Sequence, residues 1–238
     1  MPEVSVVVPV HDEEGAAAPL AEEIAAALAG SDHEIVFVDD ASRDKTREQL
    51  TALKARLPQL RVLTHRRNAG QSRAVRTGVL AARGDIIVTL DGDGQNDPAD
   101  APKLIERLRT GDARLALVGG ERLKRQDTNA KRWASRTANG VRKRLLNDKA
   151  DDTGCGLKAF RREAFLRLPY FDHMHRYLPA LMIREGYEVD FLDVSHRART
   201  TGRSKYTNLG RLWASLSDLL GVMWLRSRFR DSGGADET

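Results

Sequence analysis

The sequence is poor in cysteine and has no long apolar run, and both absences narrow the class of protein. One cysteine among 238 residues allows no disulfide within the chain, so we expect a reducing compartment. No stretch reaches the roughly 18 apolar residues that a membrane-spanning helix needs. Residues 1–15 contain neither the basic segment nor the apolar core of a signal peptide. The sequence therefore predicts a cytoplasmic location, which leaves contact with a membrane surface open.

Aromatic residues are scarce where a nucleic-acid-binding protein would need them. The chain is basic, with 39 Lys and Arg against 34 Asp and Glu, which suits nucleic acids, anionic membranes or phosphorylated substrates. However, the basic segment 124–149 has only Trp133 as an aromatic residue, whereas single-stranded nucleic acids stack on several aromatic side chains. We therefore expect no nucleic-acid partner.

Short β-branched runs alternate with helical patterns in the first half of the chain. Runs that are apolar on both faces indicate a parallel sheet covered by helices on both sides. The expected strands are residues 4–10, 34–40, 61–66, 85–91, 115–120 and 188–194. The expected helices are residues 19–30, 45–57, 70–84 and 100–111. This alternation predicts a doubly wound α/β fold.

The pattern changes after Gly120. Residues 121–147 are polar, basic and helical in pattern, residues 151–160 read as a glycine-rich turn, and residues 199–208 form a basic loop. The predicted organisation is an α/β domain (1–208), an amphipathic helix (209–230) and a disordered polar tail (231–238).

Two of the expected strands lead into pairs of acidic residues, Asp39 with Asp40 and Asp91 with Asp93. In an open α/β sheet, ligands bind beyond the carboxyl ends of the strands. Two carboxylates at that edge suit Mg²⁺ or Mn²⁺, bound together with substrate phosphates. Acidic residues after a strand also often cap the next helix, and Asp97, which precedes a proline, fits that role.

Four motifs occur in order over residues 4–98, namely VVVPVHDEEG, VFVDDASRDKT, NAGQSRAVRTGVLAARGD and LDGDGQNDP. Their order and spacing resemble family 2 glycosyltransferases with the GT-A fold, a Rossmann-like, mostly parallel sheet with helices on both faces. Two later motifs, DDTGCGLKAF and RTTGRSKYTN, are similar to the polyisoprenyl-phosphate branch, of the dolichol-phosphate mannosyltransferase type. The resemblance implies an inverting, metal-dependent transfer of sugar from a UDP- or GDP-sugar to a polyisoprenyl phosphate.

The resemblance also implies how the nucleotide sugar is held. The matching positions are Pro9, His11, Glu13, Asp39, Asp40, Gly70, Asp91 and Arg122. Pro9, His11 and Glu13 match the contacts to base and ribose, and either Asp39 or Asp40 matches an acceptor of a base N–H. His11 stands where the family often has Tyr, so a loop histidine that contacts no ligand is the alternative for this position.

The metal site and the catalytic residues follow from the same resemblance. Asp91 and Asp93 match the carboxylate ligands of Mg²⁺ or Mn²⁺, and Gln95 matches a neutral oxygen ligand. Arg122 matches a G-x-R position at which the cation stabilises a diphosphate leaving group. The implied catalytic residues are Asp91, Asp93, Arg122 and Asp152. Asp152 would orient the sugar or the acceptor, and a turn cap is the alternative for it.

Basic residues are expected to hold the acceptor. A phosphate monoester is already anionic, with a second pKa of about 6, so it needs cations rather than a general base. Arg199, Ser204 and Lys205 fall on the R-x-x-G-x-S-K pattern of the branch, and Arg132 and Ser135 lie in the basic segment. A solvated basic loop is the alternative.

Two other activities remain as alternatives. A glycosyltransferase of the same fold with a sugar-hydroxyl acceptor, in polysaccharide or lipopolysaccharide synthesis, would require a general base. The QxxRW motif of the family's processive synthases is absent from the sequence. A nucleotidyltransferase would also use carboxylates and Mg²⁺, but it usually has a glycine-rich phosphate loop near the first strand. The sequence VPVHDEEG at residues 8–15 is not such a loop.

The last organised segment has the pattern of an amphipathic helix. Its apolar residues are Leu209, Leu212, Trp213, Leu216, Leu219, Leu220, Met223 and Trp224. Asp218 argues against a membrane span, and Trp flanked by Arg suits a helix in the interface of an anionic leaflet. Packing on its own domain or on a partner subunit is the alternative. The prediction is peripheral contact with the inner face of the cell membrane, with the oligomeric state open.

Overall fold

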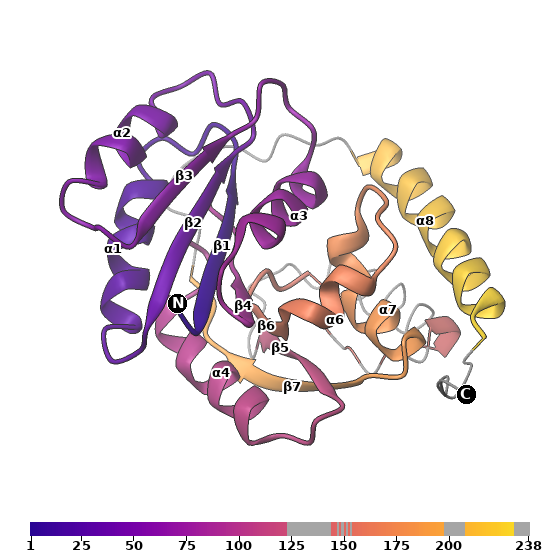
Figure 1. Cartoon of the computed structure of the whole chain (residues 1–238). Coiled ribbons are helices and arrows are strands. Elements are labelled where there is room, and N and C mark those ends of the chain that lie inside the picture. The colour runs from indigo at the N-terminus through magenta and orange to yellow at the C-terminus, as the bar shows by residue number, and fades with distance from the viewer. Residues whose placement is uncertain are drawn as a thin grey trace, which may run out of the picture.

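The protein is described from a computed structural model, in which a twisted sheet runs through the centre (Figure 1). The structure describes residues 1–122, 144–146, 148, 150, 152, 154–197 and 208–230, with only the backbone described for 208–215. The described strands are β1 (Val4–Val10), β2 (His33–Asp39), β3 (Leu60–Thr64), β4 (Ile86–Thr89), β5 (Leu115–Arg122), β6 (Lys158–Arg161) and β7 (Glu188–Val194). They form a seven-stranded sheet of order β3-β2-β1-β4-β6-β5-β7.

The strand order places a reversal point between β1 and β4. From β1 the chain moves outward to β2 and β3, and then returns to add β4 on the other side of β1. β6 runs antiparallel to both β4 and β5, whereas the other pairs of described strands are parallel. Ligands bind at such reversal points, so the carboxyl ends of β1 and β4 define the edge of interest.

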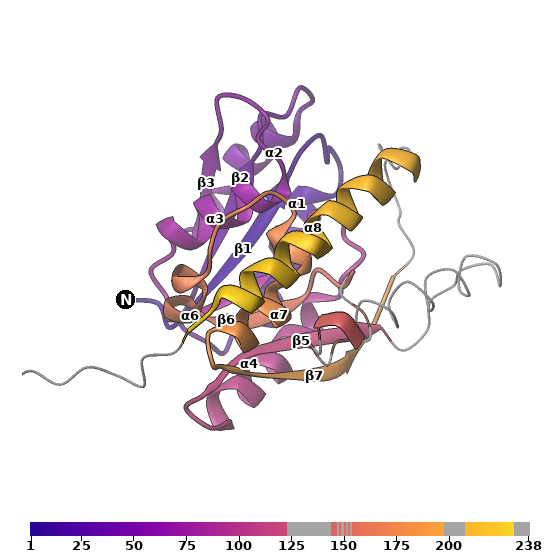
Figure 2. The ribbon, with the colours of Figure 1, turned by 90° about the vertical axis from the view of Figure 1, so that its right-hand side faces the viewer.

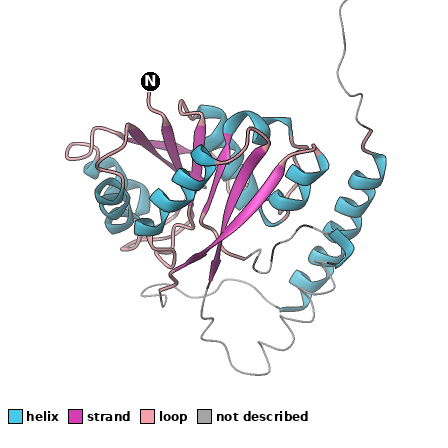
Figure 3. Ribbon diagram, turned by 90° about the horizontal axis from the view of Figure 1, so that it is seen from below, coloured by secondary structure: helices cyan, strands magenta, loops and turns pink. Residues whose placement is uncertain are grey.

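Helices cover both faces of the sheet (Figure 3). The described helices are α1 (Ala17–Ala27), α2 (Thr46–Leu53), α3 (Gln71–Ala81), α4 (Ala101–Thr110), α6 (Arg162–Arg167), α7 (Leu178–Arg184) and α8 (Asn208–Arg228), with 3₁₀ turns η1 (Pro98–Asp100) and η2 (Met174–Arg176). Side chains alternate along β1: Val6 and Val8 pack with α1, α2 and α4, whereas Val7 packs with α3, α6 and α7. The predicted mostly parallel α/β sheet is confirmed.

The structure corrects two expectations after Gly120. Residues 158–161 form the central strand β6, where the sequence suggested only a turn, because Lys158 and Arg161 at its ends hide the short apolar run. Glu121 and Arg122 continue β5 and do not begin a helix. Both strands owe their place to pairing between distant segments, since Lys158 lies opposite Thr89 and Gly119.

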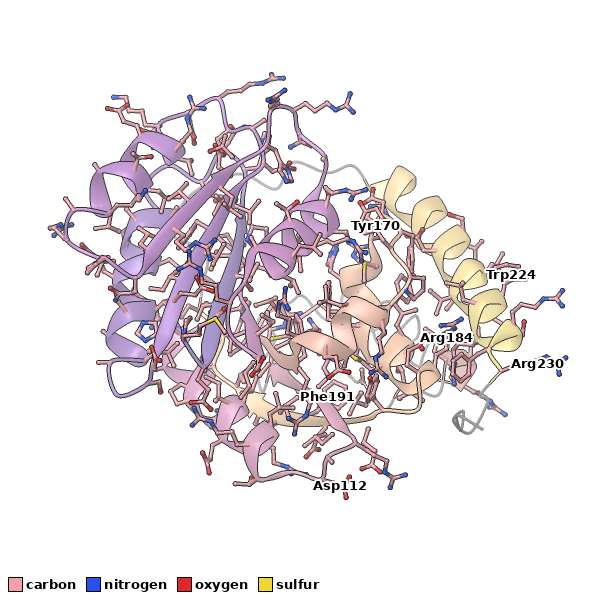
Figure 4. All side chains as sticks on the ribbon, viewed as in Figure 1. Asp112, Tyr170, Arg184, Phe191, Trp224 and Arg230 are labelled. Atoms are coloured by element: carbon pink, nitrogen blue, oxygen red, sulfur yellow. The ribbon has the colours of Figure 1, made fainter. Side chains whose placement is uncertain are left out.

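Helix α8 lies across the outside of α7 (Figures 1 and 2). This packing divides the apolar residues of α8 into an inner and an outer set. The inner set packs on the domain and consists of Leu219, Val222, Met223 and Leu225, of which Val222 is fully buried. The outer set consists of Leu216, Leu220 and Trp224, which are 47%, 58% and 59% exposed. The helix thus packs on its own domain and still presents a second apolar stripe, with Trp224 projecting outward (Figure 4).

Two polar contacts hold α8 in place. Nδ1 of His173 lies 2.9 Å from Oδ2 of Asp218, and Nε of Arg184 donates to the carbonyl of Leu225 over 3.1 Å. Arg184 reaches from α7 toward α8 in Figure 4. Within the described residues, no helix has both the length and the hydropathy of a membrane span.

Candidate active site

The ends of three strands bring together the residues that the sequence predicts to bind the nucleotide sugar. Val10 of β1 lies opposite Asp39 of β2, and the amide of Asp40 donates to the carbonyl of Val10 over 2.8 Å. β4, which leads into Asp91, pairs with the other side of β1. His11, both acidic pairs and the N-terminus of α3 therefore lie along one edge of the sheet.

The loops after β1 and β2 are joined by reciprocal hydrogen bonds. The amides of Asp12 and Glu13 donate to the hydroxyls of Ser42 and Thr46 over 3.0 and 2.9 Å, and the amide of Arg43 donates to Oδ1 of Asp12 over 2.7 Å. Asp12 is in the left-handed region, with φ of 53°, and its side-chain contact supports that conformation. Glu13 is thus held at the edge by its backbone.

The two carboxylate oxygens of Asp39 differ in their contacts with the described part of the chain. Its Oδ1 accepts from the amide of Ser42 over 2.9 Å, whereas Oδ2 is buried and has no hydrogen-bond partner among the described residues. Buried polar atoms are normally paired, so Oδ2 suits a ligand that brings an N–H or O–H donor.

The neighbouring carboxylate of Asp40 is fully used. Its Oδ1 accepts from the amide of Ala69 over 2.9 Å and lies 2.7 Å from Nδ1 of His65, and its Oδ2 accepts from the amide of Gly70 over 2.8 Å. The structure therefore favours Asp39 over Asp40 as the acceptor of a base N–H. Gly70 is the N-cap residue of α3, with φ of 87°.

His11 is oriented by the backbone of this edge. Its Nδ1 lies 2.9 Å from the carbonyl of Asp40, and a carbonyl only accepts, so Nδ1 carries the hydrogen. Its side chain is about a third exposed, and Nε2 lies 3.4 Å from Oδ2 of Asp12. Pro9 is buried within β1 beside Val38, so it shapes the floor of the edge.

Asp91 and Asp93 form the second acidic pair. Oδ1 of Asp91 accepts from Nε2 of Gln71 over 2.8 Å, and Oδ1 of Asp93 accepts from the amide of Gln95 over 3.1 Å. Burial, and then the charge of Asp93, raise the pKa of Asp91, against the opposing charges of Lys158 and Arg122. Because burial and repulsion both disfavour the carboxylate, a cation placed between the two would relieve both.

Gly156 makes room for the Asp91 carboxylate. A Cβ atom at this position would lie 2.4 Å from Cγ of Asp91, far inside van der Waals contact. The carbonyl of Gly156 accepts from the hydroxyl of Thr89 over 3.0 Å, which joins the segment before β6 to the end of β4. The glycine-rich motif thus serves the acidic pair across the sheet.

The donor atoms here are the type that Mg²⁺ and Mn²⁺ prefer. The carboxylates of Asp91 and Asp93 and the side-chain carbonyl of Gln95 are all oxygen ligands. Among the described residues, no three His, Cys, Asp or Glu side chains form a metal-binding group. A cation held by this pair would therefore complete its coordination shell with the side-chain oxygen of Gln95, with water or with substrate phosphate.

Arg122, at the end of β5, forms a bidentate ion pair with Asp152. Nε and Nη2 of Arg122 donate to the two carboxylate oxygens over 2.5 and 2.8 Å. The two side chains are only 12% and 11% exposed. Burial works against the charged guanidinium, but Asp152 outweighs it and raises the pKa of Arg122. Asp152 therefore orients a permanent positive charge near Asp91.

Sequence reasoning missed several polar residues at this edge. Lys158 is 6% exposed, donates to the carbonyl of Cys155 and acts electrostatically on both Asp91 and His175. A lysine between Leu157 and the apolar pair Ala159–Phe160 was the available signal. Nδ1 of His175 lies 2.7 Å from the hydroxyl of the buried Ser72.

One further residue, His196, was missed at the end of β7. His196 forms an isolated bridge with Asn96, and the amide of Arg197 donates to the carbonyl of Gln95 over 2.9 Å. His196 follows its strand as Asp91 follows β4, and that position was the signal. The side chain of Arg197 is committed to Glu23 and Asp97.

The remaining predicted residues divide into one confirmed role and a set outside the described chain. Asp97 caps η1, because its Oδ1 accepts from the amide of Ala99 over 3.0 Å. The residues assigned to the acceptor phosphate lie outside the described residues, namely Arg132, Ser135, Arg199, Ser204 and Lys205.

With this geometry in place, comparison with known proteins identifies the family. The model described as "Glycosyl transferase family 2" matches residues 5–168, most of the chain. The chain belongs to glycosyl transferase family 2, and it is a glycosyltransferase.

The chain is similar to two bacterial enzymes over most of its length. It is 35% identical over 227 residues to a dodecaprenyl-phosphate galacturonate synthase of Rhizobium johnstonii, covering 93% of this chain and 67% of that protein. It is 36% identical over 223 residues to an undecaprenyl-phosphate 4-deoxy-4-formamido-L-arabinose transferase of Pseudomonas aeruginosa, covering 92% and 65%. The chain thus spans about two thirds of the length of these relatives.

A solved structure supports the fold. Glucosyl-3-phosphoglycerate synthase from Mycobacterium tuberculosis, in complex with Mn²⁺, UDP and glucosyl-3-phosphoglycerate, superposes with a TM-score of 0.71 at 20% identity. The match covers 98% of this chain and 82% of that one. Together with the sheet order, it establishes the GT-A architecture.

Proposed function

We propose that this chain transfers a sugar, with inversion, from a nucleoside-diphosphate sugar to a polyisoprenyl phosphate, with Mg²⁺ or Mn²⁺ at Asp91 and Asp93. The observation that carries the proposal is the repelling, partly buried carboxylate pair at the reversal point of the sheet, next to the permanently charged Arg122. The relatives that resemble the chain along most of its length are named for polyprenyl-phosphate sugar transfer, which supports the acceptor.

The donor base is uracil in this proposal. Asp39 offers one buried oxygen, Oδ2, because Oδ1 is occupied by the amide of Ser42. Both oxygens of Asp40 are occupied as well. Uracil presents one N–H on its pairing edge and needs one acceptor, whereas guanine presents an N–H and an amino group. The neighbouring structure binds UDP, which agrees with this choice.

The chain's own residues act mainly on the leaving diphosphate during the transfer. An oxygen of the acceptor phosphate attacks the anomeric carbon as its bond to the diphosphate breaks, so that the nucleoside diphosphate leaves. A bound cation would neutralise charge on that leaving group. Arg122, fixed by Asp152, adds a preorganised positive charge that costs no reorganisation during the reaction.

An anionic acceptor removes the need for a strong base. His175 is half-buried near this edge, and its Nδ1 lies against the hydroxyl of Ser72. Desolvation and then the charges of Arg176, Lys158 and His173 lower its pKa to about 3, so the ring is neutral. A hydroxyl acceptor, the alternative, would need a base of pKa near the working pH. A phosphate acceptor would need no such base, and Arg199, Ser204 and Lys205 are the residues predicted to bind it.

Helix α8 would bring the active site to the lipid. Its outer set, Leu216, Leu220 and Trp224, is exposed, and the exposed Arg228 and Arg230 follow it. An apolar stripe beside arginines suits the interface of an anionic leaflet on the cytoplasmic side. The inner set holds the helix to the domain, so the contact is peripheral in this proposal.

The decisive experiment measures transfer of labelled sugar from a panel of UDP- and GDP-sugars, with Mn²⁺, to polyprenyl phosphate and to free polyprenol. We expect label in the organic phase with a UDP-sugar and polyprenyl phosphate alone. Asp93→Ala serves as the inactive control. Label on free polyprenol, or consumption of donor without labelled lipid, would favour the hydroxyl-acceptor alternative.

The membrane contact has a separate test. We expect the protein to co-sediment with vesicles containing anionic lipid, and Leu220→Glu with Trp224→Glu to abolish this binding while transfer to a short, water-soluble prenyl phosphate persists. Leu80→Glu, which changes an exposed leucine on α3, is the matched control. Unchanged sedimentation of the double variant would show that α8 does not bind the membrane.

A further inference from the structure

Asp40 is tied to the protein along its whole length. It is 3% exposed, and its carboxylate accepts from the amides of Ala69 and Gly70 and contacts His65. Its backbone carbonyl accepts from Nδ2 of Asn68 over 3.3 Å. A carboxylate that accepts two backbone N–H groups is a strong local anchor. This anchor joins the end of β2 to the loop of residues 65–70.

His65 extends the anchor into α3. Its Nδ1 faces Asp40 at 2.7 Å, and its Nε2 lies 2.9 Å from Oγ1 of Thr77. Nδ1–H donates to the carboxylate, which only accepts, and Nε2 forms the second hydrogen bond with the hydroxyl. The imidazole is 16% exposed. One side chain thus connects β2, the loop and the second turn of α3.

The anchored loop leads into Gln71, which contacts Asp91. Gly70, held through its amide, has φ of 87° and is the N-cap residue of α3. The first residue of the helix, Gln71, donates from Nε2 to Oδ1 of Asp91 over 2.8 Å. The position of Gln71 follows from the loop, because Gly70 sets the direction in which the helix starts.

We infer that Asp40 and His65 are positioning residues, which do not touch the nucleotide but fix the start of α3 so that Gln71 holds Asp91 in place for the metal. This inference rests on the proposed function for its metal and nucleotide readouts. It gives the adjacent acidic residues different tasks: Asp39 binds the base, and Asp40 connects the base pocket to the metal carboxylates.

Two variants of His65 separate positioning from simple packing. His65→Asn keeps a nitrogen close to the Nδ1 position and so retains the donor to Asp40, whereas His65→Leu removes both hydrogen bonds. His33→Leu, at the opposite end of β2, is the control for loss of a partly buried histidine. Loss of a second-layer partner of a metal ligand typically reduces metal affinity or activity about 10–100-fold.

The first readout is UDP binding by calorimetry at several Mn²⁺ concentrations. We expect His65→Leu to need about tenfold more Mn²⁺ for half-maximal UDP affinity, His65→Asn to recover most of that loss, and His33→Leu to match the wild type. Adding Gln71→Leu to His65→Leu should cause little further loss, because both act through the same contact. If Asp40→Asn weakens UDP binding while His65→Leu does not, Asp40 contacts the base directly and the inference is wrong.

The second readout needs no ligand. In His65→Leu, we expect hydrogen exchange at the amides of residues 69–74 to quicken about tenfold through local opening, whereas His65→Asn should keep the wild-type rates. Unchanged exchange in His65→Leu would overturn the inference. A wild-type chain that binds no nucleotide would refute the proposed function, and the exchange rates would then decide the positioning role alone.

Discussion

The two acidic pairs, Asp39 with Asp40 and Asp91 with Asp93, follow similar apolar strands, yet the protein treats them in opposite ways. Around the first pair, backbone amides and His65 supply donors, so three of the four carboxylate oxygens accept hydrogen bonds from residues that the structure describes. The second pair lies where the pKa of Asp91 is raised by burial and by its neighbour.

The two pairs differ in the hydrogen-bond donors that surround them, although the acidic residues themselves are of the same type. A carboxylate that accepts several N–H groups is a structural anchor. A partly buried carboxylate next to another is repelled by its neighbour, and a cation bound between the two would remove that repulsion. The four predictions below test this contrast, from the largest expected effect to the smallest.

Asp93→Ala should reduce sugar transfer about 1,000-fold or more, because charge on the leaving group would lose a metal-based stabilisation worth several kcal/mol. Circular dichroism should match the wild type and Tm should not fall, since the variant also removes one of the two repelling carboxylates. Removal of divalent cations with a chelator should have the same effect on the wild type. Full activity of the variant would contradict the metal assignment.

Asp39→Asn should weaken UDP binding about 10–100-fold, because a charge-assisted hydrogen bond is worth roughly 1.5–3 kcal/mol. Titration calorimetry with UDP and with GDP measures the effect, and the wild type should prefer UDP. A variant that binds UDP as tightly as the wild type would remove Asp39 from the base pocket and break the contrast with Asp40.

Substitutions in the two acidic pairs should change the stability of the protein in opposite directions. Asp40→Asn should destabilise the ligand-free protein by about 1–3 kcal/mol, since it leaves buried N–H donors facing an amide. Asp91→Asn should raise Tm by about 2–4 °C, the shift that roughly 1 kcal/mol produces in a domain of this size, because it removes one of two repelling carboxylates. Chelator-treated samples are compared by thermal and urea unfolding. A loss of stability in both variants would refute the contrast.

The pH dependence of stability provides a test at His175, which contacts Ser72 at the start of α3. Its pKa is lowered from 6.5 to about 3 by burial, then by Arg176, Lys158 and His173. Between these values the unfolded chain binds a proton that the folded chain does not, so stability falls as pH decreases from 6.5 toward 3.

The His175→Asn variant should lose this dependence. At pH 5 the wild type should have lost about 2 kcal/mol of unfolding free energy through this group, and the variant should be less sensitive over the same range. Urea unfolding at pH 7, 6 and 5 compares the two, with His33→Asn as the control. Parallel pH profiles for wild type and His175→Asn would show that His175 is not held neutral.

Most of the fold could be predicted because its signals are local. Val4–Val10 was expected and observed with the same bounds, and helices α1, α3 and α4 each fall within three residues of their expected limits. β6 could not be predicted, because Lys158–Arg161 becomes a strand only between two partners distant in the chain. The same limit explains α8, whose single apolar stripe is split by packing on α7.

The site divides along the same line. By itself, the sequence determined the residue types at the strand ends, Asp39, Asp40, Asp91 and Asp93, because apolar periodicity identifies the strands and the motifs identify the family. Only the tertiary structure decided which oxygens stay available. Asp40 and Gly70 lie 30 residues apart, and hydrogen bonds over such separations depend on how the strands are ordered in the sheet. That order, rather than local pattern, makes Asp40 an anchor and leaves Asp39 with an oxygen to offer.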